Sequence, residues 1–420
     1  MPKSSRWIAL IAAGGLALAG CGGTPVTDTG SAGAGGLKAG PGFDGTTITV
    51  GVLNPTTGPV AAAAGLPVLN ALELRVKRVN DAGGIAGKYP IKLDVQDTQY
   101  SPQTALQVYT AMSGNVVAVG SVLGTGVVQA LLPKFAQDNI VAIPATAASE
   151  WVPEAHLLPT QPTYEASFIN GLSYLVGQPG GADKKFCLYR QDDATGEANK
   201  KGVDFGAEKL GLTLAADVVF PPSTTDFTAQ VQQLKAANCD VVLFAASATF
   251  AQKTIASAIQ LDFAPTWLSN VSGVPLFLMG SPSQDYLAGH WLAAMPGVQW
   301  GDDTVPGMAQ LVEDYQKYGD PKATIDPPLW LSGYTMGLAL ESLLTKAVGD
   351  GDLTPQHLLD ISHSSDFVID FKGLSPSFTY GPAADRKSPT AVSIFSIDPT
   401  VTGNLKLVKA NVDSDAAKAF

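Results

Sequence analysis

Hydroxyl groups and small residues dominate several short segments of this sequence, each of which follows an apolar, β-branched run. These segments are residues 54–59, 120–126, 144–149, 191–196 and 246–249. They hold few side chains suited to nucleophilic or general-base work, and the sequence carries no nucleophile elbow, P-loop or zinc-protease motif. Hydroxyls and free backbone amides at helix starts form a cradle for a carboxylate or another anion. This chemistry predicts a protein that binds a small ligand and is not an enzyme.

An alternation of short strands and amphipathic helices must position these segments. Strand-like runs lie at residues 48–52, 91–95, 116–119, 140–143, 186–189, 216–220 and 241–244. Between them, apolar residues recur at helical spacing, as at Leu69, Leu72, Val76 and Val79. This pattern is typical of parallel α/β sheets, in which ligands bind at the carboxyl ends of the strands. The chain is too long for one ordinary core, so we expect two α/β lobes.

The first residues resemble an export signal. Lys3 and Arg6 precede an apolar run over residues 7–18, and two small residues then lead to Cys21. The run is shorter than a membrane-spanning helix requires, and its end resembles the bacterial lipobox, in which the cysteine is lipidated. We therefore predict a signal peptide at residues 1–20, lipidation of Cys21, and a flexible tether over residues 21–45, rich in Gly, Ala, Ser and Thr. The predicted location is the outer face of the bacterial cytoplasmic membrane.

Charge and cysteine content limit the partners. The formal charge is −11, and loss of the two basic residues of the signal takes it to −13, which disfavours nucleic acid as a partner. Cys187 and Cys239 form an even pair outside the cytoplasm, for which a disulfide and two buried thiols are both open. Neither cysteine has a second ligand at metal spacing, so we expect no metal and no cofactor.

Three further motifs resemble a known family. Residues 48–59, residues 79–87 with the run Asn-Asp-Ala-Gly-Gly-Ile-Ala-Gly, and residues 226–242 are similar to type I periplasmic binding proteins of the Leu/Ile/Val-binding kind. The resemblance implies two Rossmann-like lobes joined by a three-strand hinge, with a ligand trapped between them by closure. It implies crossings near residues 160, 270 and 380, so that lobe 1 comprises residues 46–160 and 271–380, and lobe 2 comprises residues 161–270 and 381–420.

The family also implies a partner and a set of ligand contacts. It implies a monomeric receptor that delivers its ligand to the permease of an ABC importer; a sensor for a membrane signalling protein is an alternative. A structural cell-wall lipoprotein and a nucleotide-using enzyme, suggested by Gly124-Thr125-Gly126, are further alternatives. The predicted ligand-binding residues are Thr57, Thr125, Gly126, Thr146, Ala147, Ser149, Asp193, Thr195, Ser247 and Asn270.

One departure from the family pattern bears on the ligand. Amino-acid-binding relatives commonly carry an acidic residue in the segment that here spans residues 246–250, and none is present. A buried ammonium without a counter-charge is costly, so either Asp193 supplies the charge or the ligand is an amide or an aromatic or aliphatic acid. The aromatic residues that could form its walls are Trp151, Tyr189, Phe250, Trp330 and Tyr334.

Overall fold

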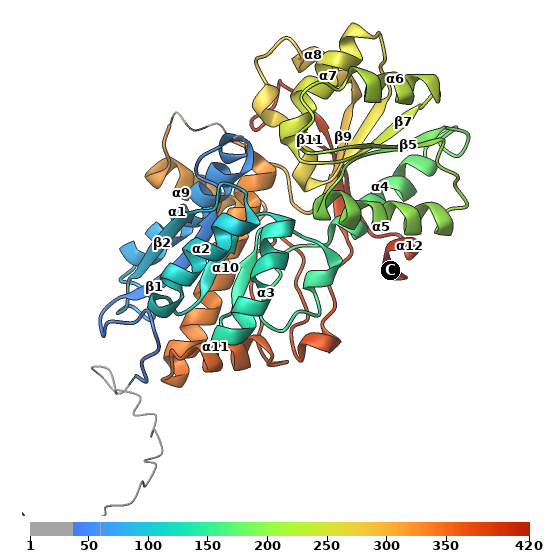
Figure 1. Ribbon diagram of the computed structural model, residues 1–420. Helices are drawn as coiled ribbons and strands as arrows, with labels where there is room; N and C mark the ends of the chain where they lie inside the picture. Colours follow the sequence, from blue (N-terminus) through green and yellow to red (C-terminus); the bar gives the residue numbers. More distant parts are fainter. Residues whose placement is uncertain (1–36, 59, 322, 324) are drawn as a thin grey trace, which may run out of the picture.

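The computed structural model describes residues 37–420, apart from residues 59, 322 and 324. In Figure 1 these residues form two α/β bodies joined by several chain segments. The predicted two-lobed α/β fold is confirmed. The predicted signal peptide, Cys21 and the first part of the predicted tether lie outside the described residues.

Lobe 1 is built on a four-stranded parallel sheet with the order β2-β1-β3-β4. Its strands are β1 (Ile48–Asn54), β2 (Ile91–Asp97), β3 (Val119–Val122) and β4 (Ala142–Pro144). Side chains alternate along β1, so that Ile48, Val50 and Val52 enter one hydrophobic cluster while Leu53 enters another on the opposite face. The helices of lobe 1 are α1 (Leu66–Asp81), α2 (Pro102–Met112), α3 (Thr125–Asp138), α9 (Pro306–Tyr318), α10 (Pro327–Asp350) and α11 (Pro355–Ser362).

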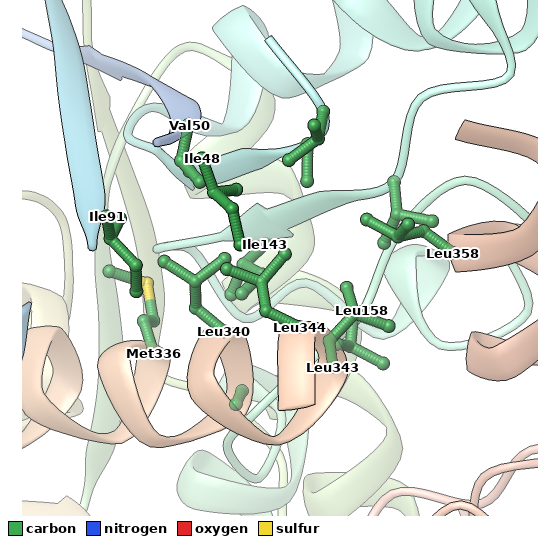
Figure 2. Close-up of a cluster of buried hydrophobic side chains, with 14 of the residues drawn as sticks. Ile48, Val50, Ile91, Ile143, Leu158, Met336, Leu340, Leu343, Leu344 and Leu358 are labelled. Carbon is green, nitrogen blue, oxygen red and sulfur yellow. The ribbon is translucent and has the colours of Figure 1, made fainter. Parts of the chain in front are cut away.

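Helix α10 covers one face of this sheet. In Figure 2, Met336, Leu340 and Leu344 of α10 lie against Ile48 and Ile91 of the sheet. Burial of each such side chain contributes about 1.5–3 kcal/mol, so this face is a main source of the stability of lobe 1. The helix also packs closely on α1, because a Cβ atom at Gly333 would lie 2.2 Å from the carbonyl oxygen of Val68. The starts of α1 and α10 are thereby held together.

Lobe 2 contains a seven-stranded sheet with the order β11-β10-β9-β8-β7-β5-β6. The parallel strands are β5 (Phe186–Gln191), β6 (Ala216–Phe220), β7 (Val241–Ala245), β8 (Thr266–Ser269) and β9 (Trp291–Met295). Two antiparallel strands, β10 (Val392–Ile397) and β11 (Leu405–Val412), complete the sheet. Its helices are α4 (Tyr164–Val176), α5 (Ala194–Lys209), α6 (Thr228–Ala236), α7 (Ala251–Gln260), α8 (Gln284–His290) and α12 (Asp415–Lys418).

The two cysteines of lobe 2 are joined by a disulfide. Cys187 lies in β5, and Cys239 lies just before β7, the neighbouring strand in the sheet. Both side chains are buried in the hydrophobic cluster of this lobe. Of the two states that the sequence left open, the structure has the bonded one, which closes a long loop around α5, β6 and α6.

Part of the predicted tether is packed on lobe 1, so its predicted end at residue 45 is wrong. Leu37 and Phe43 belong to the hydrophobic cluster of lobe 1, and the ring of Phe43 meets Tyr89 edge to face. The Lys38 backbone N–H donates to Gly351 O, and its carbonyl accepts from Leu353 N. Composition misled the prediction because glycines surround two apolar anchors that find a complementary surface only in the fold.

The second crossing between the lobes also differs from the prediction. Strand β9 pairs with β8 and β10, so residues 271–295 belong to lobe 2 and the chain returns to lobe 1 only beyond Met295, not near residue 270. The intervening residues show no strand alternation and contain Pro275, Gly280 and Pro282, so the last parallel strand was not recognised. The first and third crossing segments are tied together, because Ser375 Oγ donates to Thr160 O at 3.2 Å.

Candidate ligand-binding cleft

Loops at the carboxyl ends of strands in both sheets enclose a cavity between the lobes, as expected for parallel α/β sheets. It contains about 640 Å³ of space free of atoms, part of which is open to solvent, and we call it the inner cavity. Lobe 1, lobe 2 and the hinge all contribute to its wall. The lining residues are Val60, Ala63, Ala64, Val68, Tyr100, Leu123, Ala145, Thr146, Gln161, Tyr164, Thr195, Ser247, Ala248, Val271, Ser272, Val274, Leu329 and Ser332.

The wall of the inner cavity is apolar over much of its extent, and its polar groups are neutral. Valine, leucine and alanine side chains alternate with hydroxyls and one carboxamide. Among the described residues, no Asp, Glu, Lys, Arg or His side chain lines it. Apolar surface gains about 25 cal/mol per Å² on burial, whereas an ammonium without a counter-charge is costly to bury. Such a cavity favours a ligand with a substantial apolar part.

A wider depression, the outer hollow, adjoins the inner cavity on the side of lobe 2. The two share Val60, Ala63, Tyr100 and Ser247, and the outer hollow holds about 1340 Å³ of space that includes open solvent. Its lining includes two charged side chains, Asp193 and Lys253, and two exposed or half-buried aromatic rings, Phe250 and Phe277. The outer hollow is therefore the charged and solvated approach to an uncharged interior.

The structure divides the predicted ligand-binding residues into groups. Thr146, Thr195 and Ser247 line the inner cavity, and Asp193 lines the outer hollow. Ser149 lines a separate hollow between the lobes. The other predicted residues line none of these cavities: Thr57, Thr125, Gly126, Ala147 and Asn270.

Local hydrogen bonds explain the positions of two of these residues. The Thr57 hydroxyl and backbone N–H donate to Asp97, on the solvent side of the β1–α1 connection. The Asn270 amide donates to Asn199 Oδ1 at 2.6 Å, and its own Oδ1 caps a short helical turn. Ala147 is buried in the hydrophobic cluster of lobe 2.

Thr125 and Thr195 connect the two lobes directly. Thr195 Oγ1 donates to Thr125 Oγ1 at 3.1 Å, so the start of α5 meets the start of α3. Both residues are buried. Tyr100 of lobe 1 lies beside this pair, and burial, reinforced by the nearby Asp193 carboxylate, raises the pKa of its hydroxyl to about 12. The hydroxyl that the resemblance assigns to the ligand is here used in a contact between the lobes.

Asp193 acts as the N-cap of α5. Its Oδ1 accepts hydrogen bonds from Thr195 N at 2.9 Å and Gly196 N at 3.2 Å. Its Oδ2 accepts from Gln191 Nε2 at 2.6 Å. These contacts give the carboxylate a structural role at a helix start, where a negative charge is favourable.

Ser149 belongs to a second contact between the lobes. Its backbone N–H donates to both carboxylate oxygens of Glu165 at 3.0 Å, and Lys201 Nζ donates to its hydroxyl at 3.0 Å. Burial raises the pKa of Glu165, while the hydrogen bonds from Ser149 act in the opposite direction. The predicted ligand residue thus joins η3 (Ser149–Trp151) of lobe 1 to α4 and α5 of lobe 2.

Several lining residues were not predicted from the sequence. Two of them, Gln161 and Ser332, are polar residues in apolar or proline-rich surroundings, a signal that could have been noticed. Of the aromatic residues proposed as walls, Phe250 lines the outer hollow, whereas the others are buried in the hydrophobic clusters or beside them: Trp151, Tyr189, Trp330 and Tyr334. Their size and apolar character suit a core as well as a site, so composition could not separate the two roles.

Within the described part of the chain, no group of three or more His, Cys, Asp or Glu side chains is placed to hold a metal ion. No helix of that part is long and apolar enough to cross a membrane.

Comparison with known proteins identifies relatives. The family model described as periplasmic binding protein matches residues 47–397. Leu/Ile/Val-binding protein homolog 3 from Brucella melitensis biotype 1 is 26% identical over 211 residues, which is 47% of this chain and 54% of that protein. The protein BraC3 from Rhizobium johnstonii, named as Leu/Ile/Val-binding, is 24% identical over 202 residues, with the same coverage. The alignments thus span about half the length of these curated relatives.

Solved structures extend the similarity over nearly the whole chain. A fatty acid ABC transporter substrate-binding protein from Thermomonospora curvata is 27% identical, with a TM-score of 0.84, covering 93% of this chain and 98% of that one. A branched-chain amino acid ABC transporter protein from Thermus thermophilus with bound valine is 18% identical, with a TM-score of 0.75, and covers 91% and 99%. The chain belongs to the periplasmic binding protein family, in its type I, Leu/Ile/Val-binding-like form.

Proposed function

We propose that this protein is the extracytoplasmic receptor of an ABC importer and that it captures a small carboxylic acid with an apolar aliphatic or aromatic body. The observation that carries the proposal is the wall of the inner cavity, which among the described residues combines apolar side chains with neutral polar groups and no charge. Apolar surface would hold the body of the ligand, and neutral donors would hold its carboxyl group.

An α-amino acid fits this wall less well. Its ammonium group needs a carboxylate or several acceptors when it is buried. Asp193, the replacement considered from the sequence, lies in the outer hollow and is engaged by two backbone N–H groups and Gln191. Valine is bound by the protein from Thermus thermophilus, but the protein from Thermomonospora curvata, which is more similar in sequence, is named for fatty acids.

Closure of the lobes supplies the mechanism. A ligand in the inner cavity would touch both lobes at once, with Leu123 and Ala145 on one side and Val271 and Val274 on the other. Because these contacts exist together only when the lobes are closed, ligand binding shifts the equilibrium toward that state by its differential affinity. The bonds from Thr195 to Thr125 and from Ser149 to Glu165 would be remade in each cycle.

Anchoring and delivery are part of the same proposal. Lipidation of Cys21 would hold the receptor at the outer face of the cytoplasmic membrane, where the closed and loaded form would meet a permease. With residues 37–45 packed on lobe 1, the proposed tether shortens to residues 21–36.

Thermal unfolding in the presence of candidate ligands tests the proposed function. The protein would begin at Leu37, the first residue that the structure describes, and the panel would contain hexanoate, benzoate, hexanamide, leucine and valine. A ligand at 100 times its Kd stabilises by about 2.7 kcal/mol, which raises the unfolding midpoint by a few degrees. We expect a shift with at least one acid and none with the amino acids. Shifts with leucine or valine alone, or with no compound, would contradict the proposal.

A further inference from the structure

Two polar side chains at the hinge end of the inner cavity lack partners. Gln161 lies in the first crossing segment and is 7% exposed, and Ser332 lies in α10 and is 6% exposed. Both line the inner cavity and also a narrow hollow behind it, toward the hinge. Within the described residues, no side chain or backbone group forms a hydrogen bond with the Gln161 carboxamide or the Ser332 hydroxyl.

Four other hydroxyls on the same wall already have partners, while the hydroxyls of Tyr100 and Tyr164 also line it. The Thr146 hydroxyl accepts from Trp151 Nε1 at 3.1 Å, and Thr195 donates to Thr125. The Ser247 hydroxyl pairs with Thr249, and the Ser272 hydroxyl donates to Asn270 Oδ1. Hydrogen-bonding capacity is therefore left open at the hinge end, where it is surrounded by the apolar residues Val271, Pro328 and Leu331.

The open carboxamide and hydroxyl are not among the fully enclosed polar atoms that lack a partner in the described residues, so water can reach them in the absence of a ligand. A ligand that displaces this water must replace its hydrogen bonds, because a donor or acceptor left unpaired by binding would weaken the affinity. The Gln161 amide offers two N–H donors and the Ser332 hydroxyl offers one more. Donors of this kind match the two oxygens of a carboxylate, and hydrogen bonding to the charged form stabilises it without a cation.

We propose that Gln161 and Ser332 are the residues that bind the carboxyl group of the ligand, so that the polar end of the ligand lies at the hinge and its apolar body extends between the lobes. This assignment rests on the proposed function and specifies the orientation of the ligand in that site. It differs from the arrangement that the family resemblance implies, in which Thr125 and the loop after β4 contact the ligand. In this chain the Thr125 hydroxyl is bonded to Thr195.

A change from amide to carboxylate at Gln161 tests the orientation. Gln161→Glu keeps the shape of the side chain but places a negative charge where the ligand carboxylate is proposed to lie. Affinities of the wild type and the variant would be measured by calorimetry at pH 8 for hexanoate and benzoate and for the matching amines, hexylamine and benzylamine. We expect the variant to lose at least tenfold in affinity for the acid that the wild type binds and to gain affinity for the corresponding amine.

Further variants separate this role from a general effect on folding. Gln161→Leu should weaken acid binding about tenfold without gain of amine binding, and Ser332→Ala should weaken it several-fold. The control is Gln137→Glu, which adds the same charge at an exposed position in α3 beside Lys134 and should leave both affinities unchanged. Thermal unfolding without ligand shows that each variant is folded.

The outcomes distinguish the two proposals. A wild type that binds neither acid would overturn the proposed function, and this assignment with it. If the wild type binds an acid and Gln161→Glu binds it equally well, the carboxyl group lies elsewhere and only the assignment to Gln161 and Ser332 fails. A loss of acid binding in Gln161→Glu without any gain for the amine, together with full acid binding in Gln161→Leu and Ser332→Ala, would also overturn the assignment.

Discussion

The inner cavity and the outer hollow share part of their wall but differ in charge. Both include Val60, Ala63, Tyr100 and Ser247, yet Asp193 and Lys253 are confined to the outer hollow. A charge that is exposed to water retains its hydration, whereas a charge between closed lobes would lose it. The difference indicates that ligand selection in the inner cavity depends on shape and neutral hydrogen bonds. The charges of the outer hollow would act on the ligand before the lobes close.

The most severe test of this comparison places one charge on either side of the boundary. Ala64 lines the inner cavity only, and Ala62, two residues earlier in η1 (Ala61–Gly65), lines the outer hollow only. Ala64→Asp should reduce the affinity for a carboxylic acid by more than about a hundredfold, because it sets two negative charges together in a site without a cation. Ala62→Asp, where water screens the charge, should change it by less than about threefold.

Calorimetric titration of both variants with the acid that stabilises the wild type measures the two effects. Equal losses of affinity in the two variants would show that a charge in the inner cavity and a charge in the outer hollow affect the bound acid alike, which would contradict the comparison. The unfolding midpoint of each variant without ligand serves as the control for folding.

Asp326 tests whether the exclusion of charge extends to the helix that supports the inner cavity. It caps α10, which carries Leu329 and Ser332, by accepting a hydrogen bond from Leu329 N at 3.3 Å. Burial raises its pKa from 3.8 to about 7. Between about pH 4 and pH 7 the folded state therefore binds more protons than the unfolded state, so this residue makes stability fall as the pH rises through that window.

Asp326→Asn should remove this pH dependence. Asparagine keeps the capping oxygen and carries no charge, so the variant should exceed the wild type by about 4 kcal/mol at pH 8 and by much less near pH 4. Unfolding midpoints of both proteins across this range give the comparison. A difference that stays constant with pH would mean that the Asp326 carboxyl is ionised throughout the range.

Much of the fold could be predicted from the sequence, because strand and helix periodicity is a local property. The parallel strands up to β7, the crossover helices and the two-lobed class follow from that pattern. The last two parallel strands, β8 (Thr266–Ser269) and β9 (Trp291–Met295), were missed because neither is a run of β-branched residues: β9 contains none and β8 contains a single threonine. The packing of Leu37 and Phe43 depends on surfaces that are remote in the sequence.

The site was harder to predict. Which residues line the inner cavity depends on the direction of their side chains and on the angle between the lobes. Thr146, Thr195 and Ser247 could be selected as hydroxyls after strands, but the same rule selected Thr57, which bonds to Asp97. Gln161 lies in the hinge and not after a strand, so the rule did not reach it. A hydroxyl at a helix start is compatible with a cap, a contact between lobes or a ligand contact.

The smallest expected effect belongs to the charge at the entrance. Lys253 lines the outer hollow, is exposed, and carries the positive charge among its described lining residues. Since an exposed charge steers an approaching anion more than it holds a bound one, Lys253→Gln should slow association of the acid a few-fold at low salt and change the equilibrium affinity by less than about twofold. Stopped-flow binding at low and high ionic strength measures both. An affinity loss of tenfold at high salt would instead place the ligand carboxylate beside Lys253 and reverse the orientation proposed for it.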